Sequence, residues 1–183
     1  MRFPQYTISF FSLLFFVLLL APLTFAEGGS PHLLAAKGSL KPSEHSDPEL
    51  RLILLMNQTR TKAGLRPLKS SRILGEVARS HSREMSAGNF FSHNNPAGWG
   101  PKERLERAGF AWKAFGENIG CGLDSPEKIL QTWMNSAGHR ETILDPVYTE
   151  VGIGLVRGGE CRTYWTALFA RPRGWGGPLS KDR

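Results

Sequence analysis

The sequence WMNSAGHRETILDP, from Trp133 to Pro146, is the stretch around which the rest of the chain is expected to fold. It begins as the end of a helix, and Gly138 then predicts a tight turn, because glycine adopts backbone angles that other residues resist. The closing Asp-Pro ends the segment, since proline cannot continue a helix. His139 is therefore expected on an exposed turn, and His93 in FFSH and Glu117 in GENI are candidates to face it in one cleft.

Composition and charge describe an ordinary globular domain with a basic surface. The 183 residues are 40% hydrophobic and 21% charged, which suits one domain with flanking segments. Loss of Arg2 with a signal peptide leaves 22 basic and 16 acidic residues, so the formal charge falls from +7 to +6. This charge fits an anionic surface or simple solubility. The basic residues are scattered and no nucleic-acid motif accompanies them, so no nucleic-acid partner is predicted.

The first 26 residues have the pattern of an export signal. Arg2 precedes an apolar run from Phe10 to Leu20, which is shorter than the roughly 20 residues of a transmembrane helix. A small residue at Ala26 suits cleavage before Glu27. We expect residues 1–26 to be a cleaved signal peptide, with an uncleaved anchor as the alternative, and a secreted or extracytoplasmic protein without a transmembrane segment after cleavage.

The chain contains two cysteines, Cys121 and Cys161. An even pair in an exported protein predicts one disulfide. Closing a loop of this length would stabilise the fold by about 4 kcal/mol in the chain-entropy model. A metal site made from these cysteines is disfavoured, because the CxxC and His-Cys spacings of zinc sites do not occur.

The remaining chain alternates between helical and strand patterns. Residues 27–47 are rich in Gly, Ser, Pro and Lys and predict a linker, and residues 173–183 predict a Gly/Pro-rich tail. His81 falls on the apolar stripe of a helix, which favours a packed, hydrogen-bonded core histidine over a ligand. An α+β fold with helices packed against a small antiparallel sheet follows from the order of elements. Helices are expected over 48–63, 72–88 and 102–108 and from 125 onward, an irregular strand over 115–122, and a hairpin from 148–156 and 164–170.

Eight segments in a fixed order add a resemblance to a known family. They are LLMNQTRTKAGLRPL, VARSHSREM, FFSH, GENIG, WMNSAGHR, ILDP, EVGIG and YWTALFA. The set resembles a secreted domain of the CAP superfamily, also called SCP-like, of the compact bacterial type, over about residues 48–172. Cysteine-rich secretory proteins, insect venom antigen 5 and plant pathogenesis-related proteins belong to that superfamily. The resemblance implies a three-layer α-β-α sandwich with a central groove.

In much of this family two histidines and two glutamates line the groove. His93 matches the first histidine, Glu117 the first glutamate and His139 the second histidine. The position of the second glutamate, three residues after the helix tryptophan, is Ser136 here. Glu141 is close in sequence, but no motif places it in that role.

The chemistry of these three residues has more than one interpretation. Two imidazoles and a carboxylate are suitable ligands for zinc or another divalent metal. Glu117 could instead hydrogen-bond one imidazole and fix its tautomer. His93, Glu117 and His139 could also form a polar network that closes the groove without a metal. The segments are separate in sequence, so spacing does not decide among these interpretations.

Two functions remain open, and the sequence favours the first. The resemblance implies a monomeric binding module for a lipid, a sterol or a cell-envelope component. The alternative is an extracellular hydrolase, either metal-assisted or of the Ser/His type, with Ser92 or Ser136 as nucleophile. Neither serine lies in a nucleophile elbow, and no GxSxG motif occurs. No catalytic residue is assigned, although His93, Glu117 and His139 are the candidates for either function.

Overall fold

The computed structural model describes residues 47–174. The predicted signal peptide, almost all of the predicted linker and most of the predicted tail lie outside the described residues and stay predictions. No helix within the described range is long and apolar enough to cross a lipid bilayer.

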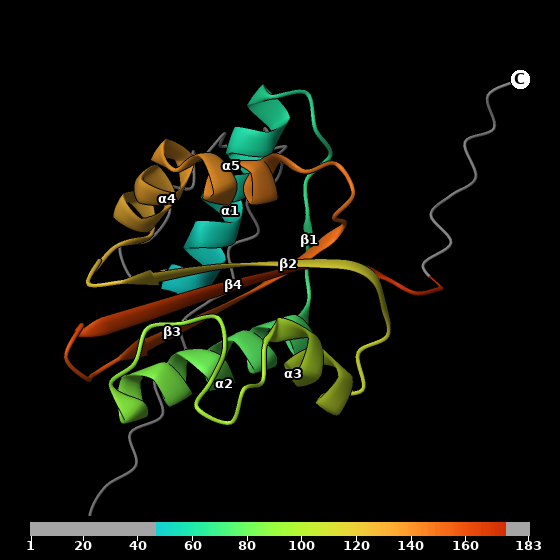
Figure 1. The fold of residues 1–183 in the computed structure, drawn as a ribbon. Coiled ribbons are helices and arrows are strands. Elements are labelled where there is room, and N and C mark those ends of the chain that lie inside the picture. Colours follow the sequence, from blue (N-terminus) through green and yellow to red (C-terminus); the bar gives the residue numbers. More distant parts are fainter. Residues whose placement is uncertain (1–46, 175–183) are drawn as a thin grey trace, which may run out of the picture. The chain divides into compact units, whose positions relative to one another are not determined.

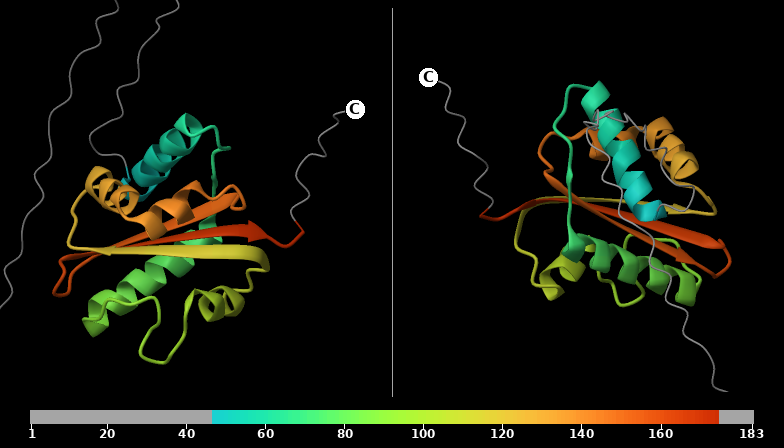
Figure 2. Two further views of the ribbon diagram at one scale, coloured as in Figure 1. Left: turned by 45° about the horizontal axis from the view of Figure 1, so that its top comes forward. Right: turned by 180° about the vertical axis from the view of Figure 1, so that it is seen from behind.

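A four-stranded sheet lies between two layers of helices (Figures 1 and 2). Helices α1, α4 and α5 cover one face of the sheet, and α2 and α3 lie against the other. The expected α+β, three-layer α-β-α sandwich is confirmed. The helices are α1 (Pro48–Lys62), α2 (Arg72–Gly88), α3 (Pro101–Arg107), α4 (Pro126–Asn135) and α5 (Ala137–Leu144). The strands are β1 (Lys69–Ser70), β2 (Trp112–Cys121), β3 (Glu150–Arg157) and β4 (Thr163–Pro172).

The strand order in the sheet is β1-β3-β4-β2. β3 and β4 form the predicted antiparallel hairpin, and β2 pairs antiparallel with β4. β1 pairs in parallel with β3, with Lys69 opposite Glu150, so the sheet is mixed rather than purely antiparallel. The sequence did not predict this strand because two residues are too few to show a strand period.

Local signals explain where most helices begin and end. The Asp47 side chain accepts a hydrogen bond from the Glu49 amide, and Pro48 follows in the first helical turn of α1. Gly64 has a φ of 76° just beyond the end of α1, a conformation in which glycine is unstrained. The Ser125 side chain caps α4 in the same way as Asp47 caps α1.

The predicted turn at Ala137-Gly138 is wrong. These residues form the first turn of α5, and the break between α4 and α5 falls at Ser136, which has extended angles of φ −97° and ψ 125°. His139 therefore lies on a helix and not on an exposed turn. A glycine inside a helix costs only about 1 kcal/mol relative to alanine, so the local signal was too weak to decide the backbone.

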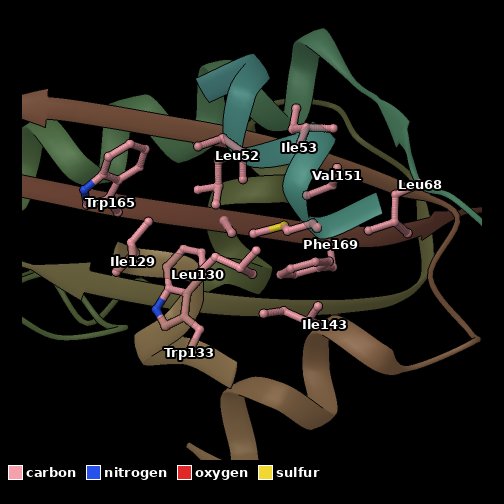
Figure 3. Packing of buried hydrophobic residues seen from close by; sticks show 13 residues of the cluster. Leu52, Ile53, Leu68, Ile129, Leu130, Trp133, Ile143, Val151, Trp165 and Phe169 are labelled. Atoms are coloured by element: carbon pink, nitrogen blue, oxygen red, sulfur yellow. The ribbon is translucent and has the colours of Figure 1, made fainter. Parts of the chain in front are cut away.

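The largest core cluster lies between the sheet and the layer formed by α1, α4 and α5 (Figure 3). Trp133 and Trp165 are almost fully buried, as expected for core tryptophans. Their indole N–H groups donate to the carbonyls of Ile119 and Leu123 over 2.9 and 2.7 Å. Both large side chains are thereby buried without an unsatisfied donor.

Two glycines of β3 allow the sheet to approach α2 closely. A Cβ atom on Gly152 would lie 2.1 Å from the backbone nitrogen of Gly75, and one on Gly154 would lie 2.1 Å from that of Arg79. The obstructing atoms belong to helix backbone, which cannot move aside as a side chain can. The alternation of Gly with Val and Ile in EVGIG is therefore a packing requirement of the α2–β3 contact.

Replacement of Gly152 by alanine should lower the free energy of unfolding by about 2–3 kcal/mol, because the added methyl group overpacks the α2–β3 contact. Gly138→Ala is the matched control. It adds the same methyl group where no atom lies within 4 Å. The control should be neutral or stabilising by up to about 1 kcal/mol, since Gly138 is helical. Urea unfolding followed by tryptophan fluorescence measures both, and equal effects would contradict the packing argument.

Candidate functional site

An open groove of about 640 Å³ runs beside the edge strand β2, between α4 and the loop after α2. It receives both histidines of the predicted set, His93 from that loop and His139 from α5. The side chain of Glu117 lies behind His93 rather than in the lining. The groove is lined by Phe91, Ser92, His93, Asn94, Ile119, Gly120, Cys121, Leu123, Ile129, Thr132, Trp133 and His139.

Glu117 is buried, with a side chain that is only 1% exposed. Its Oε1 accepts a hydrogen bond of 2.8 Å from Nδ1 of His93, and its Oε2 accepts one of 2.6 Å from Arg104. A carboxylate can only accept, so Nδ1 of His93 carries the proton in this bond and Nε2 is the nitrogen that remains available. Glu117 thus orients His93, which was one of the interpretations that the sequence left open.

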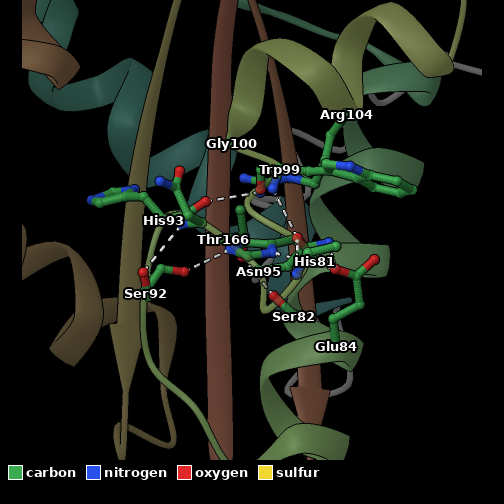
Figure 4. A network of polar contacts seen from close by, with 12 residues as sticks. His81, Ser82, Glu84, Ser92, His93, Asn95, Trp99, Gly100, Arg104 and Thr166 are labelled. Carbon is green, nitrogen blue, oxygen red and sulfur yellow. Dashed lines mark hydrogen bonds and ion pairs between the residues drawn. The ribbon is translucent and has the colours of Figure 1, made fainter.

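Arg104 is the residue of the site that the sequence did not reveal. Its Nη1 donates to the carbonyls of His93 and Trp99 over 2.8 and 2.9 Å (Figure 4). Its Nη2 donates to Glu117. One buried guanidinium therefore fixes both the backbone and the carboxylate partner of His93. Arg104 stands in the charged helix PKERLER, where nothing in the local pattern separates a buried arginine from an exposed one.

A ladder of side-chain hydrogen bonds holds the loop that carries His93. His81 is fully buried, and its Nε2 lies 3.0 Å from the Ser92 carbonyl, which confirms the predicted core histidine. The Ser92 hydroxyl accepts from the Asn94 amide over 3.1 Å, and Asn95 Oδ1 accepts from the Trp99 amide over 2.9 Å. Burial, then the nearby charge of Arg104, lowers the pKa of His81 below its ordinary value of 6.5.

The two phenylalanines of this loop have different roles. Phe90 packs with the cluster of Met85, Ile119 and Tyr164, as expected for an anchor. Phe91 is 50% exposed and lines the groove, so only Phe90 anchors the loop to the core. The exposed ring of Phe91 belongs to the groove's apolar surface.

His139 faces the groove from the first turn of α5. Its Nδ1 has no hydrogen-bond partner among the described residues. Burial, and secondly the charge of His93, lowers the pKa of His139, so its ring is neutral at neutral pH. The Asn118 side chain donates to the backbone carbonyl of His139 over 3.0 Å. This bond ties the start of α5 to β2.

The geometry bears on both chemistries that the sequence left open, metal binding and hydrolysis. In the range 47–174, no group of three or more His, Cys, Asp or Glu side chains could hold a metal ion. Glu117 is 1% exposed and does not line the groove, which leaves His93 and His139 as the candidate ligands in the lining. Neither Ser92 nor Ser136 forms a hydrogen bond through its hydroxyl with an imidazole in this part of the chain. Glu141 is exposed on α5.

The predicted disulfide joins Cys121 at the end of β2 to Cys161 in the β3–β4 connection, with Cα atoms 5.6 Å apart. Cys121 also lines the groove. The bond fixes the end of the edge strand beside the apolar half of the site.

Together, a mixed sheet between two helical layers and a groove faced by two histidines define a domain of the SCP type. The family model for CAP, the cysteine-rich secretory protein family, matches residues 53–169, and the chain belongs to this family.

Two relatives come from Bacillus subtilis. The uncharacterized protein YkwD is 38% identical over 128 residues, which cover 70% of this chain and 49% of YkwD. The uncharacterized membrane protein YlbC is 33% identical over 151 residues, which cover 77% of this chain and 42% of YlbC. The chain thus spans about half or less of the length of these curated relatives.

Solved structures agree with the fold. An extracellular SCP-domain protein from Bacillus anthracis is 30% identical with a TM-score of 0.62, and the match covers 68% of this chain and 40% of that one. A cysteine-rich secretory protein from Staphylococcus aureus has a TM-score of 0.59 at 24% identity, and the match covers 70% of this chain and 40% of that one. The second likeness shows the fold alone.

Replacement of Arg104 by methionine should lower the free energy of unfolding by about 3–5 kcal/mol, because it leaves the buried Glu117 carboxylate without its cationic partner. Combining Arg104→Met with Glu117→Leu should recover part of this loss, since the unpaired charge is then removed. Arg107→Met is the control on the same helix. Arg107 is exposed and stacks over Trp99, which is worth less than about 1 kcal/mol at the surface. Denaturant unfolding of the wild type and the three variants measures these free energies. An equal cost of Arg107→Met and Arg104→Met would contradict the stabilising role of the Arg104–Glu117 ion pair.

Proposed function

We propose that this CAP domain is an extracytoplasmic binding module whose groove holds the apolar part of a lipid, a sterol or another cell-envelope component. The observation that carries the proposal is the lining of the groove, which contains no Asp, Glu, Lys or Arg. A site lined in this way favours an uncharged, largely apolar ligand. Its volume of about 640 Å³ lies within the range typical of small-molecule sites, about 300–1,000 Å³.

The lining of the groove combines apolar side chains with two imidazoles. The apolar lining residues are Phe91, Ile119, Leu123, Ile129 and Trp133. Nε2 of His93 and the neutral imidazole of His139 offer hydrogen bonds. A hydroxyl or carbonyl at the end of an apolar molecule matches this arrangement, because the protein would bury the chain and orient the head.

Location outside the cytoplasm is supported by the export pattern in residues 1–26 and by a similar protein from Bacillus anthracis described as extracellular. The predicted charge of +6 after signal cleavage would favour contact with an anionic envelope. Binding is favoured over hydrolysis because a hydrolase needs a nucleophile within hydrogen-bond reach of a base, and Ser92 and Ser136 lack that contact in the described range.

Replacement of Thr132 by tryptophan should block the groove. Thr132 is exposed on α4 and lines the cavity, whereas its neighbour Gln131 is exposed but does not. Binding of a fluorescent fatty acid or sterol should weaken by about tenfold or more in Thr132→Trp, a loss of about 1.4 kcal/mol. Gln131→Trp, which adds the same side chain outside the groove, should bind as the wild type does.

Fluorescence titration and pull-down with extracted envelope fractions measure this difference. The proposal fails if the wild-type chain binds none of these materials at any salt concentration. It also fails if both tryptophan variants lose binding equally.

A divalent metal held by His93 and His139 is the second candidate. It is favoured by one observation, the carboxylate hydrogen bond on Nδ1 of His93, which is the usual support of a metal-bound histidine. With only two protein ligands, the remaining positions of zinc would be taken by water or by the ligand's head group.

Calorimetric titration of the metal-stripped chain with zinc tests this candidate. We expect binding to weaken by at least about tenfold in both His93→Ala and His139→Ala, because each removes half of the protein ligands. Glu117→Gln should weaken it less, since that residue acts through His93. Absence of heat in the wild type, where a control zinc protein gives a signal, would contradict metal binding and leave the histidines as a polar network.

A further inference from the structure

A second cavity of about 580 Å³ lies at the other edge of the sheet, where α1 ends and β1 and β3 begin. It shares no lining residue with the histidine groove. Four of its lining residues are basic and none is acidic. The lining consists of Arg60, Gly64, Leu65, Arg66, Pro67, Lys69, Pro146, Val147, Tyr148, Thr149 and Arg171.

Arg60 places a positive charge beneath this cavity. The residue is 1% exposed, yet its guanidinium donates only to backbone carbonyls, those of Arg66, Ile143 and Asp145. Carbonyl dipoles satisfy its N–H groups without cancelling its charge. The Asp145 carboxylate lies near enough to act on Arg60, but its Oδ1 accepts from the Val147 amide and it does not pair with the guanidinium.

The basic residues at the rim come from three separate segments. Arg66 follows α1, Lys69 begins β1 and Arg171 is near the end of β4, and all three are exposed. In residues 47–174, neither Arg66 nor Arg171 forms an ion pair, whereas Arg51, Arg72, Arg79 and Arg104 each do. Convergence of Arg66 and Arg171, two cations without an ion pair in this range, on one hollow raises its potential and concentrates anions there.

The cavity also contains a hydroxyl with unused capacity. Thr149 lines it, and its Oγ1 is buried without a hydrogen-bond partner among the described residues. Arginine forks and a hydroxyl donor are the groups that proteins use to hold phosphate oxygens.

We infer that this cavity is a second binding site, specific for a phosphate group, with Arg66 and Arg171 as its principal ligands and Lys69 and Thr149 as further contacts. The buried charge of Arg60 supports the site from below. A polymer of repeating phosphate esters would also contact the basic residues at the open rim, whereas a free phosphate ion would occupy only the base of the cavity. The site is independent of the apolar groove, so either can exist without the other.

Calorimetric titration of the purified full-length chain at low ionic strength tests the inference with three probes: inorganic phosphate, sn-glycerol 3-phosphate and a poly(glycerol phosphate) chain. The double variant Arg66→Gln, Arg171→Gln should bind all of them at least about tenfold more weakly, since hydrogen bonds to charged groups are lost. The double variant Arg83→Gln, Lys113→Gln is the matched control, because it also removes two positive charges and both residues are exposed and line neither cavity. It should bind as the wild type does, and so should Thr132→Trp, which blocks only the groove.

Tighter binding of poly(glycerol phosphate) than of the two small probes would support a polymeric ligand. Equal binding of all three probes would support a free phosphate or a single phosphate ester. Both results support the phosphate site. The inference is overturned if none of the probes binds to the wild type. It is also overturned if the control Arg83→Gln, Lys113→Gln weakens binding as much as Arg66→Gln, Arg171→Gln, which would show attraction to overall charge alone.

Discussion

The hydrogen-bonded contact among Arg104, Glu117 and His93 is the interaction on which the site depends. A carboxylate that is 1% exposed has lost its hydration, and this cost must be offset by charged and hydrogen-bonding partners. Arg104 supplies the charge, and its Nη1 donates to two carbonyls of the loop that carries His93, those of His93 and Trp99. The same ion pair therefore attaches α3 to β2 and sets the position of the first histidine.

The motif GENIG explains how one strand positions two histidines from opposite helical layers. Successive side chains of a strand point to opposite faces, so Glu117 reaches His93 on the α3 side while Asn118 reaches the His139 carbonyl on the α5 side. The flanking glycines share the face of Asn118. A Cβ on Gly116 would lie 2.6 Å from the Tyr148 hydroxyl, and one on Gly120 would lie 2.1 Å from a methyl group of Ile129. β2 can thus be an edge strand with α4 and α5 packed closely against it and the groove along its side.

The sequence predicted features that repeat or that carry strong local signals. The apolar stripe of α2 placed His81 in the core, and alternation of residues on either side of Gly158-Gly159 predicted the β3–β4 hairpin. Three features depended on contacts between distant segments and had no local signal. The burial of Arg104 arises from Glu117, thirteen residues away, and β1 exists only through its pairing with β3. The helical state of Gly138 is supported by the hydrogen bond that Asn118 donates to the carbonyl of the neighbouring His139. The sequence around Gly138 gives no sign of this contact, because Asn118 lies in a distant segment.

The position at which the family resemblance implies a second glutamate holds Ser136, which does not line the groove. Where the family pattern has a second acid, this chain has a serine at the break between α4 and α5, and the remaining acid is neutralised behind His93 by Arg104. The lining is left with two imidazoles, one of them kept neutral by burial, and with no carboxylate. A cation bound there would depend on imidazole nitrogens alone. An uncharged head group on an apolar chain would lose little hydration free energy when it leaves water. A groove without a carboxylate therefore fits the proposed uncharged, apolar ligand better than it fits the proposed metal.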